Sequence, residues 1–196
     1  MNPEHLRICG SREWAELLGE QVLPWVLDGV ELGDDVLEVG PGPGVTTDVL
    51  RERVERLTVV ELDPDLATDL ADRLRGTNVG VLRADGTTLP FDTGRFSAAT
   101  CFTMLHHVPS PELQDRLFME LRRVVRPGGM IVGSDSVETE KRRDLHVGDV
   151  YQPVRPAELG SRLEAAGLVG VEVEVGPGDL PEPFFRFSGR VGAPRP

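Results

Sequence analysis

The sequence predicts an α/β protein built on an open, doubly wound and mostly parallel sheet. Short apolar runs alternate along the chain with segments of helical periodicity; the runs are residues 36–39, 57–62, 79–82, 96–102 and 130–133. Their continuous apolarity suits strands that helices cover on both faces. Alternation of strand and helix at this rhythm is typical of right-handed crossovers in such a sheet.

The helices between these strands carry recognisable start and stop signals. Asp63 and Ser110 are N-cap residues, and each is followed by a proline suited to the first helical position. Leucines at helical spacing follow both caps. We expect Gly76 to end the first of these helices and the Pro-Gly-Gly run at 127–129 to end the second.

The two ends of the chain show residue patterns that differ from the alternating strands and helices of its middle. Residues 12–30 have apolar residues at helical spacing, and Pro24 is a point where this helix would kink. Residues 155–166 predict a short helix. The run 168–176 alternates valine with glutamate, which is typical of an antiparallel strand with one wet face, and 184–191 is its expected partner.

Length, charge and cysteine content limit the classes of protein. A chain of 196 residues predicts one domain, with an N-terminal helix at 12–30, a core at 34–135 and a C-terminal part at 136–196. The net charge of −12 argues against nucleic-acid partners and anionic membrane surfaces. Without a membrane-spanning run or a signal-peptide core, we expect a cytoplasmic protein. Cys9 and Cys101 are expected to be reduced thiols, and their spacing predicts no metal site.

The segment VLEVGPGPGVTT, residues 36–47, is the strongest sign of a ligand site. Its three alternate glycines, Gly40, Gly42 and Gly44, leave the backbone bare just before a helix N-terminus. The dinucleotide fingerprint G-x-G-x-x-G would need glycine where Val45 or Thr47 stands. The chain also lacks a G-K-[ST] phosphate loop, so a pyrophosphate ligand is not favoured.

Acidic residues at the ends of successive strands favour S-adenosylmethionine instead. This ligand has no phosphate; it carries a carboxylate, an ammonium, a sulfonium and an adenosine. Glu38 leads into the glycine turn, Glu61 ends the second strand, and Asp85 follows the third. Glu61 is placed to accept the ribose hydroxyls and Asp85 to accept from the adenine amino group. Asp63 competes with Glu61 but is better explained as the helix N-cap.

Residues 34–135 resemble the class I S-adenosylmethionine-dependent methyltransferases, in the type 11 small-molecule group. The resemblance rests on the segments VLEVGPGPGVTT, VVELDPDL, RADGTTLPF, FSAATCFTMLHHV and LRRVVRPGGMIVGSD. It implies a Rossmann-like methyltransferase fold whose seven strands follow the order 3-2-1-4-5-7-6, with strand 7 antiparallel. It also implies S-adenosyl-L-methionine as cofactor and S-adenosyl-L-homocysteine as product.

The resemblance assigns cofactor contacts to particular positions. The expected cofactor-binding residues are Glu38, Gly40, Pro41, Gly42, Gly44, Glu61, Leu62, Asp85, Gly86 and Cys101. One departure is Ser97, where the family often has an acid. We expect this change to matter little, because that residue is usually not a main ligand contact.

The expected activity is methyl transfer to a small-molecule acceptor. The candidate substrate-side residues follow the fourth and fifth strands and are Met104, His106, His107 and Tyr151. A histidine can take a proton near neutral pH, so His106 and His107 are candidates for a general base, and at most one should face the sulfonium. The polar segment 136–151 is either a lid or a plain surface loop.

Two alternatives stay open at this point. Residues 36–66 also resemble the first half of ribosomal RNA adenine dimethylases, but the stretch CFTMLHHV lacks their N-L-P-Y-type motif. A non-catalytic protein that only binds the cofactor is the second alternative. The acceptor, the methylated atom, a general base and the oligomeric state are not determined by the sequence.

Overall fold

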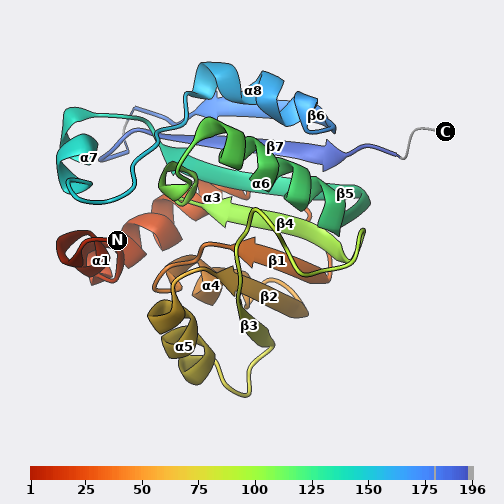
Figure 1. The fold of residues 1–196 in the computed structure, drawn as a ribbon, viewed down its shortest axis with the longest axis horizontal. Helices are drawn as coiled ribbons and strands as arrows, with labels where there is room; N and C mark the ends of the chain where they lie inside the picture. Colours follow the sequence, from red (N-terminus) through yellow and green to blue (C-terminus); the bar gives the residue numbers. More distant parts are fainter. Residues whose placement is uncertain (179, 194–196) are drawn as a thin grey trace.

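The computed structural model describes residues 1–178 and 180–193, and it contains one seven-stranded sheet (Figure 1). The strand order is β3-β2-β1-β4-β5-β7-β6, in which β7 runs antiparallel to both of its neighbours. The predicted fold class and strand order are therefore confirmed. The strands are β1 (Asp35–Val39), β2 (Arg56–Glu61), β3 (Val79–Arg83), β4 (Phe96–Phe102), β5 (Val125–Ser136), β6 (Leu168–Val175) and β7 (Phe184–Val191).

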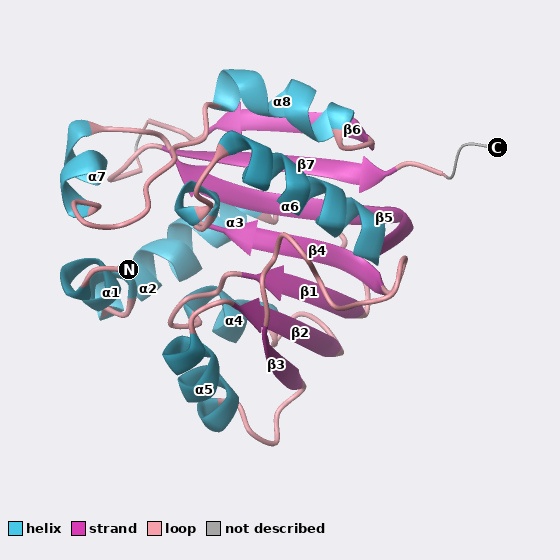
Figure 2. Ribbon diagram, in the orientation of Figure 1, coloured by secondary structure: helices cyan, strands magenta, loops and turns pink. Residues whose placement is uncertain are grey.

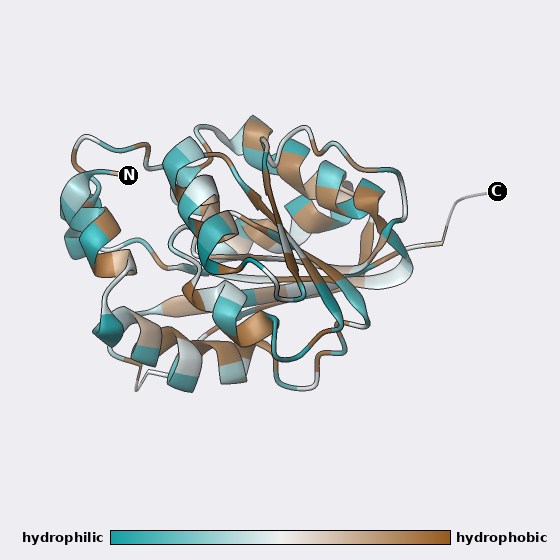
Figure 3. Ribbon diagram, turned by 90° about the horizontal axis from the view of Figure 1, so that it is seen from below, coloured by the Kyte–Doolittle hydropathy of each residue, from teal (hydrophilic) through white to brown (hydrophobic). Residues whose placement is uncertain are grey.

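Helices cover both faces of the sheet, as Figures 2 and 3 show. Two hydrophobic clusters fill the spaces between the layers. One cluster packs α6 and α8 against the sheet; the other packs the N-terminal helices, α4 and α5. The helices are α1 (Pro3–Cys9), α2 (Arg12–Leu17), α3 (Leu23–Val26), α4 (Val45–Leu50), α5 (Pro64–Arg73), α6 (Pro111–Val124), α7 (Glu140–Leu145) and α8 (Pro156–Ala165).

The predicted helix starts are present with their caps. The Asp63 carboxylate accepts from the Asp65 and Leu66 amides at the start of α5. The Ser110 hydroxyl accepts from the Leu113 amide at the start of α6. Each cap satisfies amides that the first helical turn leaves without a partner.

The Pro-Gly-Gly run differs from its predicted role. Helix α6 already ends at Val124, and residues 127–129 lie inside β5, which begins directly after the helix. The pairing of β4 with β5 shifts register between Phe96 and Ala98. A Cβ on Gly129 would overlap the Ser97 carbonyl oxygen, so glycine lets the two strands approach at this irregularity.

The N-terminal region is more broken than the predicted helix at 12–30. Helix α2 continues into a π-helical segment, Leu18–Val22, and then into α3, which ends at Val26. The π segment lies just before Pro24, which has no amide hydrogen to donate. Among the described residues, no helix is long and apolar enough to cross a membrane.

Helix α1 was not predicted from the sequence. It is capped by the Asn2 side chain, which accepts from the His5 amide, and it has Pro3 at the first helical position. This is the same signal that identified α5 and α6. Its shortness concealed it, because seven residues do not show a helical period.

Candidate functional site

A cavity of about 580 Å³ opens at the carboxyl ends of the parallel strands. In Figure 1 these strand ends face α1 and α7. The cavity is lined by the glycine turn after β1, the ends of β2 and β3, the segment after β4, and the N-terminal helices. Its position agrees with the general rule that open α/β sheets bind ligands beyond the carboxyl ends of their strands.

The glycine turn presents bare backbone to this cavity. Gly40, Gly42 and Gly44 have φ angles of 69°, 56° and 88°, in the left-handed region that side chains disfavour. Gly40, Pro41 and Gly42 line the cavity, whereas Gly44 is the N-cap of α4. A Cβ on Gly40 would lie 2.9 Å from the Met104 Cε atom, so a larger residue would close the turn onto the far wall.

Glu61 lies in the cavity wall with its carboxylate tied to the glycine turn. Its Oε2 atom accepts from the Gly42 amide (3.0 Å), and its Oε1 atom accepts from the Asp63 amide (2.9 Å). Burial raises the pKa of Glu61, and these amide hydrogen bonds oppose that rise. The carboxylate is held in one orientation and has lone pairs left for a ligand.

Asp85 and Leu62 stand at the more open part of the lining. The Asp85 Oδ1 atom accepts from both the amide and the hydroxyl of Thr87, at 2.8 Å each. This arrangement fixes the side chain and leaves Oδ2 available to a donor on the ligand. Leu62 is 64% exposed and offers an apolar surface beside Glu61.

Glu38 lies behind the glycine turn and outside the cavity lining. It is 1% exposed, and its two carboxylate oxygens accept from the hydroxyls of Thr46 and Thr47. Burial raises the pKa of Glu38 from its ordinary value of 4.5 to about 7, against the effect of the two hydroxyls. Glu38 thus joins β1 to the start of α4 and supports the glycine turn that lies between them.

Other expected residues also lie outside the lining. Cys101 is fully buried in the core, and burial raises the pKa of its thiol. A Cβ on Gly86 would lie 2.7 Å from Val39 Cγ1, so this glycine lets its loop pack closely on β1. Ser97, which was not expected to contact the ligand, donates to the Leu32 carbonyl (2.7 Å) and accepts from the Asp35 amide (3.1 Å), which supports the start of β1.

The two adjacent histidines diverge beside the cavity. His107 lines the cavity together with Met104, whereas His106 does not. The His106 Nδ1 atom lies 2.6 Å from the buried Asp135 carboxylate. Burial by itself would raise the pKa of Asp135, but His106 outweighs it and holds the pKa below its usual value. Tyr151 is also outside the lining, and its ring stacks on His146 at 4.2 Å between centroids.

Burial lowers the pKa of His107 to about 3, and the neighbouring imidazoles add to this effect. The ring is therefore neutral at neutral pH. A general base works best when its pKa lies near the working pH. An imidazole whose pKa is this low is therefore a poor general base.

The N-terminal helices supply an apolar wall that the sequence analysis did not identify. Cys9, Trp14 and Leu18 face the cavity together with Phe102 at the end of β4. Burial raises the pKa of the Cys9 thiol to about 11, so this side chain is an uncharged part of the wall. The only sequence signal for this wall was the helical spacing of Trp14 and Leu18.

The segment 137–153 packs on α1 and contains α7. The Asn2 side chain donates to the carbonyls of Leu145 (2.9 Å) and Val147 (3.3 Å). Asp149 and Val150, from the end of this segment, reach the cavity lining. Helix α1 and the segment 137–153 together form a cap over the cavity.

The charges of the lining fit a ligand with cationic groups and no phosphate. Four acidic residues line the cavity, and within the described part of the chain no lysine or arginine does; the acids are Glu61, Asp63, Asp85 and Asp149. A phosphate-bearing ligand would meet repulsion here, because phosphates are normally held by arginine, lysine or clustered amides. S-adenosylmethionine fits the bare glycine turn and the fixed carboxylates.

Comparisons with known proteins identify relatives of this chain. Residues 36–129 match the family described as "Methyltransferase domain". The ribosomal RNA small subunit methyltransferase A of Leptothrix cholodnii is 38% identical over 58% of this chain and 48% of its own length. The ubiquinone biosynthesis O-methyltransferase of Pseudomonas fluorescens (strain Pf0-1) is 29% identical over 74% of this chain and 68% of its own length. The chain thus spans about half the length of this ribosomal RNA methyltransferase.

A solved structure shows the same fold over the whole chain. The S-adenosylmethionine-dependent methyltransferase of Aquifex aeolicus superposes with a TM-score of 0.70 at 19% identity, covering 97% of this chain and 99% of that one. The matched family spans the glycine turn, Glu61 and Asp85. These findings identify residues 36–129 as a methyltransferase domain, and the chain has the fold of the S-adenosylmethionine-dependent methyltransferase of Aquifex aeolicus.

Proposed function

We propose that this protein transfers the methyl group of S-adenosylmethionine to a small, largely apolar acceptor that carries no phosphate. The observation that carries the proposal is the lining of the cavity. One wall has fixed carboxylates and a bare backbone turn, and another, made by Cys9, Trp14 and Leu18, is apolar. The relatives named ubiquinone biosynthesis O-methyltransferases also favour a small acceptor.

The cofactor end would hold the donor through three groups. Glu61 would accept hydrogen bonds from the ribose hydroxyls. The hydrogen bonds that it accepts from the Gly42 and Asp63 amides hold its carboxylate in place for this. Asp85 would accept from the adenine amino group with its free Oδ2 atom. Gly40 and Gly42 let the methionine part approach the backbone. The bound cofactor supplies an activated methyl group on a positively charged sulfur.

The acceptor end would orient the nucleophile and exclude water. The cap covers this end, and Met104 and Phe102 close it from the side of the sheet. Orientation alone can supply a large part of a rate enhancement when a reactive donor is already bound. We assign no general base, because the low pKa of His107 makes it a poor proton acceptor at neutral pH.

RNA methylation is the second candidate, and the relative that is 38% identical favours it. The acidic lining and the net charge of −12 favour the small acceptor instead, since RNA binding relies on neutralising phosphates. We also place the protein in the cytoplasm, where both free thiols, Cys9 and Cys101, would remain reduced.

A labelling experiment separates these possibilities. The protein is incubated with methyl-labelled S-adenosylmethionine and with either the small-molecule or the RNA fraction of a cell extract. We expect labelled product in the small-molecule fraction, unchanged by phosphatase treatment and absent with Glu61→Ala. Label in RNA would support the second candidate. Cofactor binding without any labelled product would support a non-catalytic binding protein and contradict the proposal.

A further inference from the structure

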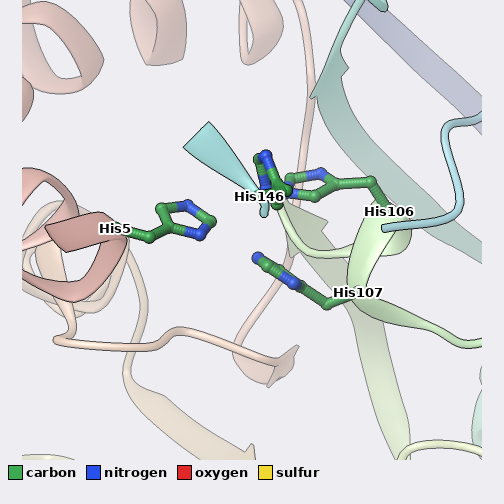
Figure 4. A group of neighbouring side chains, drawn as sticks. All are labelled: His5, His106, His107 and His146. Atoms are coloured by element: carbon green, nitrogen blue, oxygen red, sulfur yellow. The ribbon is translucent and has the colours of Figure 1, made fainter. Parts of the chain in front are cut away.

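All four histidines of the chain lie together beside the cavity (Figure 4). His5 comes from α1, His106 and His107 from the short 3-10 turn after β4, and His146 from the residue after α7. Their candidate ligand atoms all lie within 4.8 Å of one another. Figure 4 shows the four rings converging from these separate segments on one point.

The hydrogen bonds of the rings define their tautomers. Each Nδ1 atom faces an oxygen that can accept but cannot donate; the pairs are His5 with Asp149 (3.2 Å), His106 with Asp135 (2.6 Å), His107 with the Val150 carbonyl (3.2 Å) and His146 with the Arg142 carbonyl (2.6 Å). Each Nδ1 of a neutral ring must therefore carry the hydrogen. The lone pair of each ring then lies on Nε2.

Two of these lone pairs are buried without a partner among the described residues. The Nε2 atoms of His106 and His146 are buried and make no hydrogen bond within the described part of the chain. Neither ring is more than 3% exposed. Buried acceptors without a donor are unfavourable, and gathering several at one point adds repulsion between their lone pairs. An electrophile placed among the rings would satisfy them all at once.

We propose that His5, His106, His107 and His146 bind one divalent first-row transition-metal ion through their Nε2 atoms. Neutral imidazole is a preferred ligand of zinc, copper, nickel and iron. A tetrahedral zinc ion with bonds of about 2.0 Å places its ligand nitrogens about 3.3 Å apart. The rings therefore need to approach by no more than about 1.5 Å at their widest separation.

The surroundings of the rings resemble the outer shell of a metal centre. Histidine ligands of metals usually donate their other ring hydrogen to a carboxylate or a backbone carbonyl. Two of these rings face carboxylates and two face carbonyls. Asp135 and Asp149 would also supply two negative charges to balance those of the ion. Tyr151 covers His146 with its ring.

The ion would join the cap to the core of the protein. It would link α1 and the residue after α7 to the turn after β4, whereas the hydrogen bonds of Asn2 join α1 only to the segment that contains α7. His107 and Asp149 also line the cavity, so the site forms part of the wall of its acceptor end. The inference concerns metal binding and does not depend on the acceptor proposed above.

Cobalt titration tests the site directly. The protein is prepared without a histidine tag, stripped of metal with a chelator, and titrated with Co²⁺. We expect one equivalent to produce the visible absorption of tetrahedral cobalt, and Zn²⁺ to displace it. Because the chain has no other histidine, an imidazole-ligated ion can only be bound by this cluster.

Two variants and one control complete the test. His5→Ala removes a ligand from the peripheral helix α1; Co²⁺ binding should weaken and the spectrum should change, because water would replace the fourth imidazole, with folding checked by circular dichroism. Asp149→Asn should weaken Co²⁺ binding about 10- to 100-fold, the usual effect of losing an outer-shell partner. Asp144→Asn, an exposed site in the same segment, should leave binding unchanged. Absence of stoichiometric binding, a thiolate charge-transfer band, or an unchanged spectrum in folded His5→Ala would overturn the proposal.

Discussion

The two ends of the cavity are built in different ways. The cofactor end consists of residues next to one another in the sequence or at the ends of adjacent strands, namely the glycine turn, Glu61 and Asp85. The proposed acceptor end is assembled from α1, the turn after β4 and the segment 137–153, which are far apart in the chain. The first end can therefore be recognised as a motif, whereas the second exists only in the folded protein.

We infer from this difference that cofactor binding is common to proteins of this topology, whereas closure of the acceptor site is particular to this chain. The parallel strands and their connecting turns bring the cofactor residues together in any protein of this topology. The cap depends on individual contacts, such as the bonds of Asn2 to the carbonyls of Leu145 and Val147. Substitutions should accordingly affect cofactor binding at one end and closure of the acceptor site at the other.

The largest effect on cofactor binding is expected from Glu61→Ala. Two charge-assisted hydrogen bonds at about 1.5 kcal/mol each correspond to a loss of affinity of roughly hundredfold. Isothermal titration with S-adenosylhomocysteine measures it, with Asp65→Ala as the control because Asp65 is exposed and outside the lining. A folded Glu61→Ala variant with wild-type affinity would break the assignment of this end to the cofactor.

The stability of the protein is expected to depend on pH through Glu38, which lies beneath the glycine turn. The pKa of Glu38 is raised to about 7 in the folded protein, so its contribution to stability is present below about pH 4.5 and is lost as the pH rises through 7. Between pH 5 and pH 8 the loss is about 2–3 kcal/mol in the free energy of unfolding.

Glu38→Gln removes this titration while keeping the shape of the side chain. Urea unfolding at the two pH values should show that the wild type loses stability relative to the variant as the pH rises. An identical pH dependence in both proteins would mean that Glu38 does not titrate in this range.

The division between the cofactor end and the acceptor end also separates what could be predicted from the sequence from what could not. The strands and the caps at Asp63 and Ser110 were predicted from residue patterns, and the sheet order from the family resemblance. Among the residues expected to bind the cofactor, Glu61 and Asp85 lie in the lining, whereas Glu38 does not, because its hydroxyl partners turn it inward. That orientation depends on side-chain packing, which residue spacing does not encode.

The acceptor end could not be predicted for a different reason. His5 and His146 are 141 positions apart and show no metal-type spacing, so only the folded chain reveals that they meet. The signal for α1 was present in Asn2 and Pro3 but was too short for periodicity to support it.

A smaller effect is expected from Asn2→Ala, which tests the cap. Losing this helix cap costs about 1 kcal/mol, which increases the open population of the cap about fivefold. Trypsin should then cut faster at Lys141, whose side chain is 80% exposed, while affinity for S-adenosylhomocysteine stays the same. Asn78→Ala is the matched control, because Asn78 also donates to two carbonyls but lies elsewhere. A parallel loss of cofactor affinity in Asn2→Ala would contradict the separation of the two ends.

The smallest effect is expected at Asp85, which is exposed at the mouth of the cavity. Its contact with the adenine amino group should favour S-adenosylhomocysteine over the inosine analogue by on the order of 1 kcal/mol. Competition binding should show this preference in the wild type and its loss in Asp85→Ala. Equal binding of the two ligands by the wild type would remove the assignment.

Hydrogen exchange with and without S-adenosylhomocysteine tests the location of the cofactor site most directly. The account predicts added protection in the glycine turn at 39–45, in 61–65 after β2 and in 84–88 after β3, since these segments form the cofactor end. Protection confined to 137–150, with the glycine turn unchanged, would place the cofactor at the other end of the cavity and contradict the account.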